Sequence, residues 1–213
     1  MTQHEVLTPK QRRERNRQEM VDNILSIARE MMRADGVAAL SLNGIARRLG
    51  MTTPALYTYF DSKHAIYDAL FRLGFEEFGQ RMRPPVLERE TPFEQLEAIF
   101  EQHMAFALDN PDLYQLMMQR PVPGFVPSEE SMAVSLDNLQ EASEWLQRVF
   151  ERMEFTLDMP VEEARDLLFA MSQGLTDLHL ANDPGAPVGQ GRFGKLPPRA
   201  AQLFINAMQP GKD

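Results

Sequence analysis

Residues 41–63 read SLNGIARRLGMTTPALYTYFDSK, and this stretch decides the fold. Ser41 is a good helix N-cap, and it is followed at helical spacing by four apolar residues: Leu42, Ile45, Ala46 and Leu49. Gly50 ends this short helix, and Thr52 is expected to cap a second one that carries Pro54 in its first turn. Two short helices around a glycine-containing turn predict a helix-turn-helix.

The second helix of this motif has two contrasting faces. Leu56 and Phe60 are predicted to point inward, whereas the outward residues are Thr53, Ala55, Tyr57, Thr58 and Tyr59. Hydroxyl and methyl groups of this kind suit base edges and phosphates of DNA. Lys63 follows in the first turn of the next helix, where a cation is unfavourable unless a phosphate binds there too.

The other periodic segments also predict helices. One covers Val21 to Asp35, and another begins at Asp61 or Ser62 and runs to about Met82, where Pro84 and Pro85 stop it. The later helices are expected over 93–108, 111–118, 128–153, 160–182 and 200–208, with loops at 121–127 and 183–198. No strand is expected. The fold class is therefore all-α, with an N-terminal three-helix helix-turn-helix domain and a C-terminal helical domain.

The composition excludes several classes of protein. The 213 residues are 43% hydrophobic and 25% charged, which is typical of a folded globular chain. The absence of cysteine excludes disulfides, thiolate zinc sites and cysteine nucleophiles. No apolar run approaches the ~18 residues of a membrane span, and the polar N-terminus carries no secretory signal. We expect a cytoplasmic protein.

Charge divides the chain in two. The net charge of −9 separates into +3 for residues 1–63 and −12 for residues 64–213. Five basic residues crowd the N-terminus: Lys10, Arg12, Arg13, Arg15 and Arg17. Such a segment is either a phosphate-binding end or a solvated tail. We expect a flexible basic arm over 1–17, a DNA-binding domain over 18–63 with its motif at about 41–60, and a helical body over 64–213.

Several positions together resemble the TetR family of bacterial repressors. They are Ile24-Leu25, Ala28 and Gly36, then Ile45-Ala46-Arg47-Arg48-Leu49-Gly50-Met51, then Leu56-Tyr57-Thr58-Tyr59-Phe60-Asp61-Ser62-Lys63. The resemblance covers about residues 18–72. It implies an all-helical homodimer whose N-terminal head binds double-stranded DNA and whose C-terminal body dimerises and binds a small-molecule effector.

The resemblance also implies a set of DNA contacts. The residues are Arg13, Arg15, Arg17, Ser41, Asn43, Thr52, Thr53, Pro54, Ala55, Tyr57, Tyr59 and Lys63. Asn43 stands where some members place an arginine that reads guanine, and its amide suits adenine better. The arginines before the first helix are expected in a minor groove or along the backbone. Tyr59 has packing as an alternative role.

The C-terminal half more weakly resembles a subgroup with a Trp-His-Gly or Val-His-Gly signature. The similar stretches are 111–117 and 171–178, although Ser172-Gln173 replaces the residues before Gly174. In the family the last two long helices form a four-helix dimer interface. The interface candidates are Gly174, Leu175, Leu178 and Phe204.

Methionine and aromatic residues are frequent in the body and suit an adaptable apolar pocket. The candidates are Phe100, His103, Met104, Met117, Met118, Phe125, Trp145 and Met171. Each of them has ordinary core packing as the alternative. As a set, they predict a pocket for an apolar or aromatic effector.

The glycine-rich segment 189–195 imitates a nucleotide-binding loop. Leu196 stands where a phosphate loop needs Ser or Thr for magnesium, and prolines occur on both sides instead of a strand and a helix. We therefore expect a flexible surface loop, with no metal, no cofactor and no enzymatic activity. The hypothesis is a repressor released from a palindromic operator by a small apolar inducer. The alternatives are a constitutive or architectural DNA-binding protein and a small-molecule carrier.

Overall fold

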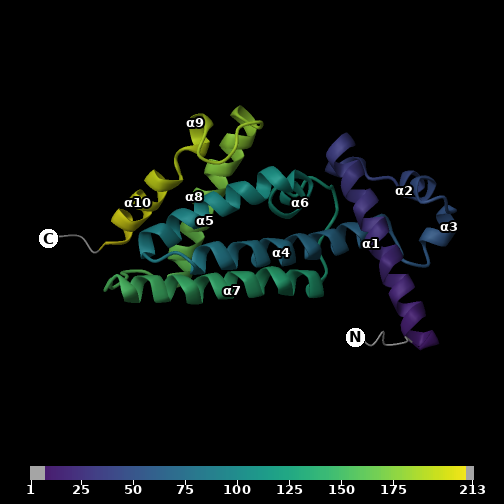
Figure 1. Cartoon of the computed structure of the whole chain (residues 1–213), viewed down its shortest axis with the longest axis horizontal. Helices are drawn as coiled ribbons and strands as arrows, with labels where there is room; N and C mark the ends of the chain where they lie inside the picture. The colour runs from purple at the N-terminus through teal and green to yellow at the C-terminus, as the bar shows by residue number, and fades with distance from the viewer. Residues whose placement is uncertain (1–7, 210–213) are drawn as a thin grey trace, which may run out of the picture.

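The computed structural model describes residues 8–209, and within them every regular element is helical and no strand occurs, so the all-helical prediction is confirmed (Figure 1). The elements are α1 (Pro9–Asp35), the 3-10 helix η1 (Val37–Ala39), α2 (Leu42–Arg48), α3 (Thr53–Leu56), α4 (Lys63–Leu87), α5 (Pro92–Asp109), α6 (Pro111–Tyr114), the π-helix η2 (Gln115–Gln119), α7 (Glu129–Arg152), α8 (Val161–Asn182), α9 (Gly191–Gly194) and α10 (Pro197–Met208).

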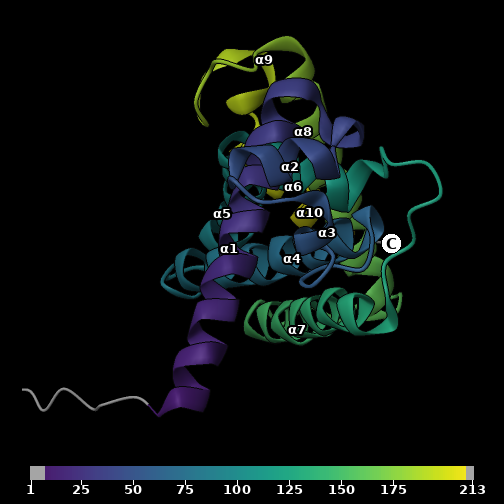
Figure 2. The ribbon, with the colours of Figure 1, turned by 90° about the vertical axis from the view of Figure 1, so that its right-hand side faces the viewer.

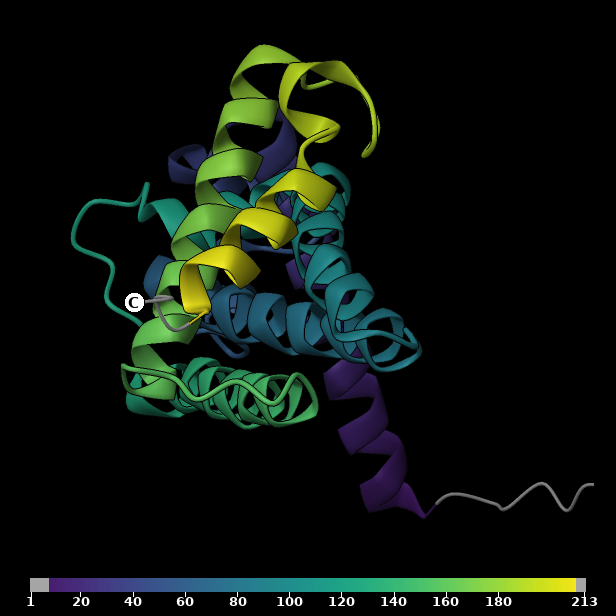
Figure 3. The same ribbon diagram turned by 90° about the vertical axis from the view of Figure 1, so that its left-hand side faces the viewer.

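The molecule consists of a head, α1 to α3, and a body, α5 to α10, with α4 running from one into the other (Figure 1). In the body α4 packs between α5 and α7, and α10 lies across α5 and α8 (Figure 3). Seen from the head end, α2 and α3 are turned outward and the first turns of α1 extend past the rest of the molecule (Figure 2). Within residues 8–209 no helix is both long and apolar enough to span a membrane.

Two apolar cores hold these parts together. The first core packs the inner faces of helices α1–α4 against α6 and η2. It includes Ile24, Ile45, Leu70 and Leu113. The second lies between α5, α7, α8 and α10 around Phe150. Because the first core extends from the head into α6 and η2, a shift of these segments cannot leave the head unaffected.

The flexible arm expected over residues 1–17 is wrong from residue 8 onward. Thr8 and Gln11 form a capping box and Pro9 occupies the first helical position, so α1 already begins there. Residues 10–17 are therefore the exposed first turns of a 27-residue helix. Residues 1–7 of the expected arm lie outside the described part of the chain.

The helix-turn-helix follows its local signals. Ser41 accepts a hydrogen bond from the Gly44 amide at 3.3 Å, and Thr52 accepts one from the Ala55 amide at 3.4 Å. Gly50 provides the turn with a φ of +66°, which favours glycine. Ser62 caps α4 by accepting from the Ala65 amide at 3.1 Å. As predicted, Ile45, Ala46, Leu56 and Phe60 are buried.

Two boundaries predicted from proline and glycine differ in the structure. Helix α4 continues through Pro84 and Pro85 to Leu87, since the fixed φ of proline is itself a helical value, although each proline removes one backbone donor from this end of the helix. The loop expected over 183–198 contains α9 and the start of α10. It is fastened where Asp183 accepts from the Arg192 amide at 2.8 Å.

Candidate functional site

The outer face of α3 and its flanks is accessible. Ser41, Asn43, Thr52, Pro54 and Tyr57 are exposed, and Thr53, Ala55, Tyr59 and Lys63 are partly exposed. Arg13, Arg15 and Arg17 are exposed along α1. These twelve predicted positions are all on the head or at the start of α4, and the figure of the head end shows α2 and α3 facing outward (Figure 2).

Two of these residues are joined across the turn. The Thr53 hydroxyl donates to Oδ1 of Asn43 at 2.7 Å, which ties the start of α3 to the start of α2. With its Oδ1 engaged in this way, the amide NH2 of Asn43 is the group left to donate. A donor at this place suits an acceptor on a base edge or a phosphate.

Arg17 fixes α1 against the end of the motif. Its Nη1 donates to the Thr58 carbonyl at 3.0 Å, and its guanidinium lies 5.4 Å from the ring centre of Tyr59. Tyr59 also packs against the first core, which agrees with its alternative role in packing, and its contact with DNA stays a prediction. The Lys63 ammonium at the start of α4 lies 5.7 Å from the ring centre of Tyr67.

The body encloses a cavity of about 830 Å³ between α4, α5, η2, α7 and α8. Five of the predicted pocket residues line it: His103, Met117, Met118, Phe125 and Trp145. Phe100, Met104 and Met171 do not; the first two are buried in the body and Met171 packs against the second core. The prediction is wrong for these three because the sequence gives residue type but not the rotation of α5 and α8 about their axes.

An apolar row on α4 makes up much of the remaining wall and was missed. It consists of three aromatic residues and a methionine: Phe71, Phe75, Phe78 and Met82. These residues are spaced by four, three and four, which is the signal of one helix face. That spacing could have been read from the sequence, although it does not distinguish a cavity wall from a filled core.

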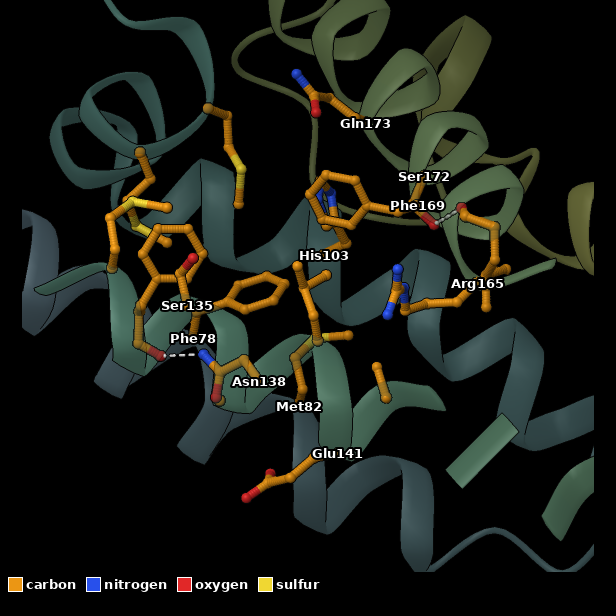
Figure 4. Close-up of a pocket in the computed structure, with 18 of the residues that line it drawn as sticks. Phe78, Met82, His103, Ser135, Asn138, Glu141, Arg165, Phe169, Ser172 and Gln173 are labelled. Atoms are coloured by element: carbon orange, nitrogen blue, oxygen red, sulfur yellow. Dashed lines mark hydrogen bonds between the residues drawn. The ribbon is translucent and has the colours of Figure 1, made fainter. Parts of the chain in front are cut away.

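His103 is the most deeply buried polar group of this wall. Its Nδ1 lies 3.0 Å from the Thr176 hydroxyl, and its Nε2 has no hydrogen-bond partner among the described residues. Its ring meets those of Phe78 and Phe169 edge to face (Figure 4), and it meets the Tyr114 ring in the same way. Burial lowers the pKa of His103 to about 4, so the imidazole is neutral at pH 7.

Other polar groups lie at the wall. Trp145 Nε1 is buried and finds no hydrogen-bond partner within residues 8–209. Arg165 Nη1 donates to the Ser143 hydroxyl at 2.9 Å. Asn138 Nδ2 donates to the Phe75 carbonyl at 2.8 Å. No group of three His, Cys, Asp or Glu residues in the described chain is arranged to hold a metal ion.

A buried ion-pair network connects the cavity wall to the head. Asp112 of α6 accepts from Nε of both Arg29 and Arg33 on α1, each at 2.8 Å. The segment then continues directly into η2, whose Met117 and Met118 line the cavity. This network was not predicted because its partners are about 80 residues apart in the chain and no local pattern relates them.

The same segment is held on its other side by α8. The Tyr114 hydroxyl donates to the Asp177 carboxylate at 2.9 Å, and burial together with this bond raises the pKa of the phenol. Gln119 Nε2 also donates to Asp177, at 3.2 Å. The segment α6–η2 therefore contacts α1, α8 and the cavity at once.

The predicted dimer residues divide into two groups. Phe204 is 1% exposed in the second core, so the prediction that it reaches a partner is wrong for this side chain. Gly174 and Leu178 are exposed on α8, and Leu175 is partly buried. Leu167 of α8 and Leu203 of α10 are also exposed. Helices α8 and α10 are neighbours in the body (Figure 3), and Leu167, Gly174, Leu178 and Leu203 are called the apolar strip below.

Comparison with known proteins gives matches over the head and over the whole fold. Residues 24–70 match the sequence model of a family described as bacterial regulatory proteins, tetR family. A nucleoid occlusion factor, SlmA of Marinobacter nauticus, is 29% identical over 92 residues, 43% of this chain and 47% of that protein. The chain thus spans about half the length of this curated relative.

Two solved structures share the fold over nearly their whole length. A transcriptional regulator of the TetR/AcrR family from Thermobifida fusca has a TM-score of 0.65 and 23% identity, covering 90% of this chain and all of that one. The regulator FadR from Bacillus subtilis, solved in complex with stearoyl-CoA, has a TM-score of 0.67 and 18% identity, covering 88% and 99% of the two chains.

Proposed function

We propose that this chain is a repressor whose DNA binding is controlled by a small apolar effector. Its N-terminal domain and its fold are similar to those of TetR-family DNA-binding transcription regulators. Two copies form a homodimer in the cytoplasm and present two heads to a pseudo-palindromic operator. The half-sites lie about one helical turn, or a multiple of it, apart. The resemblance of the body to the Trp-His-Gly subgroup stays a prediction.

One observation carries the proposal of an effector: the cavity of about 830 Å³ inside the body. Its size falls within the range of about 300–1,000 Å³ that is usual for small-molecule sites, and most of its wall is apolar. A filled core would have favoured a regulator without an effector. That FadR was solved with stearoyl-CoA supports a ligand with a long apolar chain in this fold.

The proposed signal passes from the cavity to the head along two contiguous segments. Helix α4 carries the apolar row of the cavity wall. It begins at Lys63, shortly after α3 in the chain. The segment α6–η2 carries Met117 and Met118 and holds α1 through Asp112. An effector shifts the heads only if it binds the released form more tightly than the DNA-bound form.

A homodimer through the outer surface of α8 and α10 belongs to this proposal. The exposed Leu167, Gly174, Leu178 and Leu203 give an apolar strip, and Gly174 leaves open space for close approach of a partner helix. Such a strip is expected to be covered by the same strip of a second copy about a twofold axis.

The second candidate is a constitutive DNA-binding protein. One partial relative is named for nucleoid occlusion rather than for transcription, whereas the cavity supports an effector. A small-molecule carrier without DNA binding fits the cavity, but it leaves the exposed face of α3 and the basic turns of α1 without a role.

Fluorescence anisotropy with DNA from upstream of the protein's own gene tests the DNA-binding role. It is measured at two salt concentrations with an unrelated duplex of equal length as the control. We expect tight binding that exceeds the control at the higher salt. Equal, salt-sensitive binding to both duplexes would leave only the electrostatic attraction and favour the architectural alternative.

A further inference from the structure

The charged groups of the cavity wall differ in where they lie. The Trp145 indole lines the cavity, although its Nε1 is buried and has no hydrogen-bond partner within the described residues. The Arg165 guanidinium lies at the cavity wall and is turned toward the interior (Figure 4). The carboxylates at the wall, Glu141 and Glu144, belong to residues that are exposed at its edge.

Arg165 is a largely buried cation with an incomplete environment. Its side chain is 16% exposed, whereas its partner Asp166 is 66% exposed and contributes a single oxygen to Nε and Nη2. Nη1 is held by the neutral Ser143 hydroxyl. A cation taken out of water is costly unless it is paired and fully hydrogen-bonded. An oxyanion in the cavity would complete the hydrogen bonds of Arg165.

Arg83, which also lines the cavity, differs from Arg165 in its exposure and in its partner. It makes two parallel bonds to Glu141, at 2.8 and 2.9 Å, and both side chains are about half exposed. Arg83 is therefore already satisfied at the surface. Arg165 is the arginine at this wall whose burial and geometry call for an additional acceptor.

The rest of the cavity suits an apolar body. The row from Phe71 to Met82 on α4 faces Phe169 of α8 and the methionines of η2. His103 is neutral there and adds no charge to this part of the wall. We propose that the cavity binds an amphiphilic acid, with its carboxylate or similar oxyanion on Arg165 and its apolar chain or ring system along α4.

This inference rests on the proposed function, because it takes the cavity as the effector site. Binding in the cavity can be followed by the fluorescence of the protein itself. Trp145 is the only tryptophan in the chain. Its emission is recorded while dodecanoate, 1-dodecanol or dodecyltrimethylammonium is added below its micellar concentration, with calorimetry as the second readout. The three probes share an apolar chain of the same length and differ in head group.

We expect dodecanoate to bind at least about tenfold more tightly than either other probe, because a charge-assisted bond to arginine is made by the acid alone. Arg165→Gln should remove this preference, and Arg199→Gln, an exposed substitution on α10, should keep it. The probe series on the unmodified protein decides the matter even if a variant fails to fold.

Several results would overturn the inference: equal or tighter binding of the alcohol or the ammonium, an unchanged preference in Arg165→Gln, or no binding of any probe. Failure of the proposed function looks different. Probe-free protein that does not bind upstream DNA specifically contradicts the regulator, whatever the probes do. Acid binding without release of DNA contradicts effector control while leaving the ligand class intact.

Discussion

Arg29 on α1 and Asp112 on α6 form a buried ion pair, with Nε 2.8 Å from Oδ2 and no exposed surface on the Asp112 side chain. Arg33, one helical turn further along α1, occupies the other oxygen at 2.8 Å. Two arginines of the head thus hold the segment that continues into the cavity wall. This pairing fixes α6, which belongs to the body, against α1 of the head.

Asp112→Asn should lower the free energy of unfolding by about 3 kcal/mol, because it removes the buried carboxylate charge on which Arg29 and Arg33 converge. Asp109→Asn is the matched control, since Asp109 meets Arg81 at 2.7 Å in a pair that is largely exposed. The Asp109→Asn variant should lose less than about 1 kcal/mol of its free energy of unfolding. Urea unfolding measures both, and equal losses would show that the buried network adds nothing specific.

Thr53→Val should weaken operator binding and relax discrimination at one base pair in each half-site, by about 1–3 kcal/mol. Valine keeps the shape of threonine but cannot donate to Asn43 Oδ1, so the Asn43 amide loses its fixed direction. Thr156→Val is the control, because Thr156 is an exposed threonine of the body, outside the head. Binding to a set of singly substituted operators measures the effect. Unchanged discrimination in Thr53→Val would contradict a reading role for Asn43.

Lys63→Ala and Tyr57→Ala should weaken binding to every DNA sequence while the protein stays dimeric. For Lys63→Ala, removing one phosphate contact should reduce the slope of log affinity against log salt by about 1. Lys195→Ala, an exposed change in the body, should leave the slope unaltered. Anisotropy at several salt concentrations and sedimentation give the two readouts. Loss of the dimer in either head variant would contradict this division of roles.

His103 should make the protein less stable in mild acid. Its pKa is about 4 in the folded chain and near 6.5 when unfolded, so between these values the unfolded state binds more protons. Stability is therefore lost as the pH falls from about 6.5 toward 4, with a loss of about 2 kcal/mol by pH 5. His103→Gln should lack this part of the dependence. Denaturant unfolding of both proteins at pH 7 and pH 5 checks the difference, and parallel losses would contradict it.

Leu178→Asp and Leu203→Asp should each shift the protein toward monomers, because a charge would be buried at the proposed interface. Leu136→Asp on α7 is the control at an equally exposed leucine outside the strip. Light scattering with size-exclusion chromatography gives the mass. A dimer that persists in both strip variants, or dissociates in the control, would place the interface elsewhere.

The head could be predicted closely because its signals are local. The caps at Ser41 and Thr52 and the glycine at 50 each act within four residues. The early start of α1 was equally readable, since Thr8, Pro9 and Gln11 already spell a capping box. The basic residues 10–17 favour a solvated arm, but the capping box at Thr8 and Gln11 places them in a helix.

The cavity and its link to the head could be predicted only in part. Phe100 and His103 are both buried on α5, yet only His103 reaches the cavity, because helix rotation is set by packing against distant elements. Likewise, Phe204 resembles an interface residue in sequence, but Leu203 beside it is the exposed one. Asp112 and Arg29 meet only once the chain has folded, so no spacing in the sequence relates them.

The most direct test of effector control titrates dodecanoate into the preformed complex of protein and labelled upstream DNA, recording DNA anisotropy and Trp145 emission together. The account predicts that anisotropy falls to that of free DNA as the Trp145 signal saturates, and that both changes require Arg165. Saturation of Trp145 with anisotropy unchanged would contradict it, because the cavity would then be filled without any effect on DNA binding.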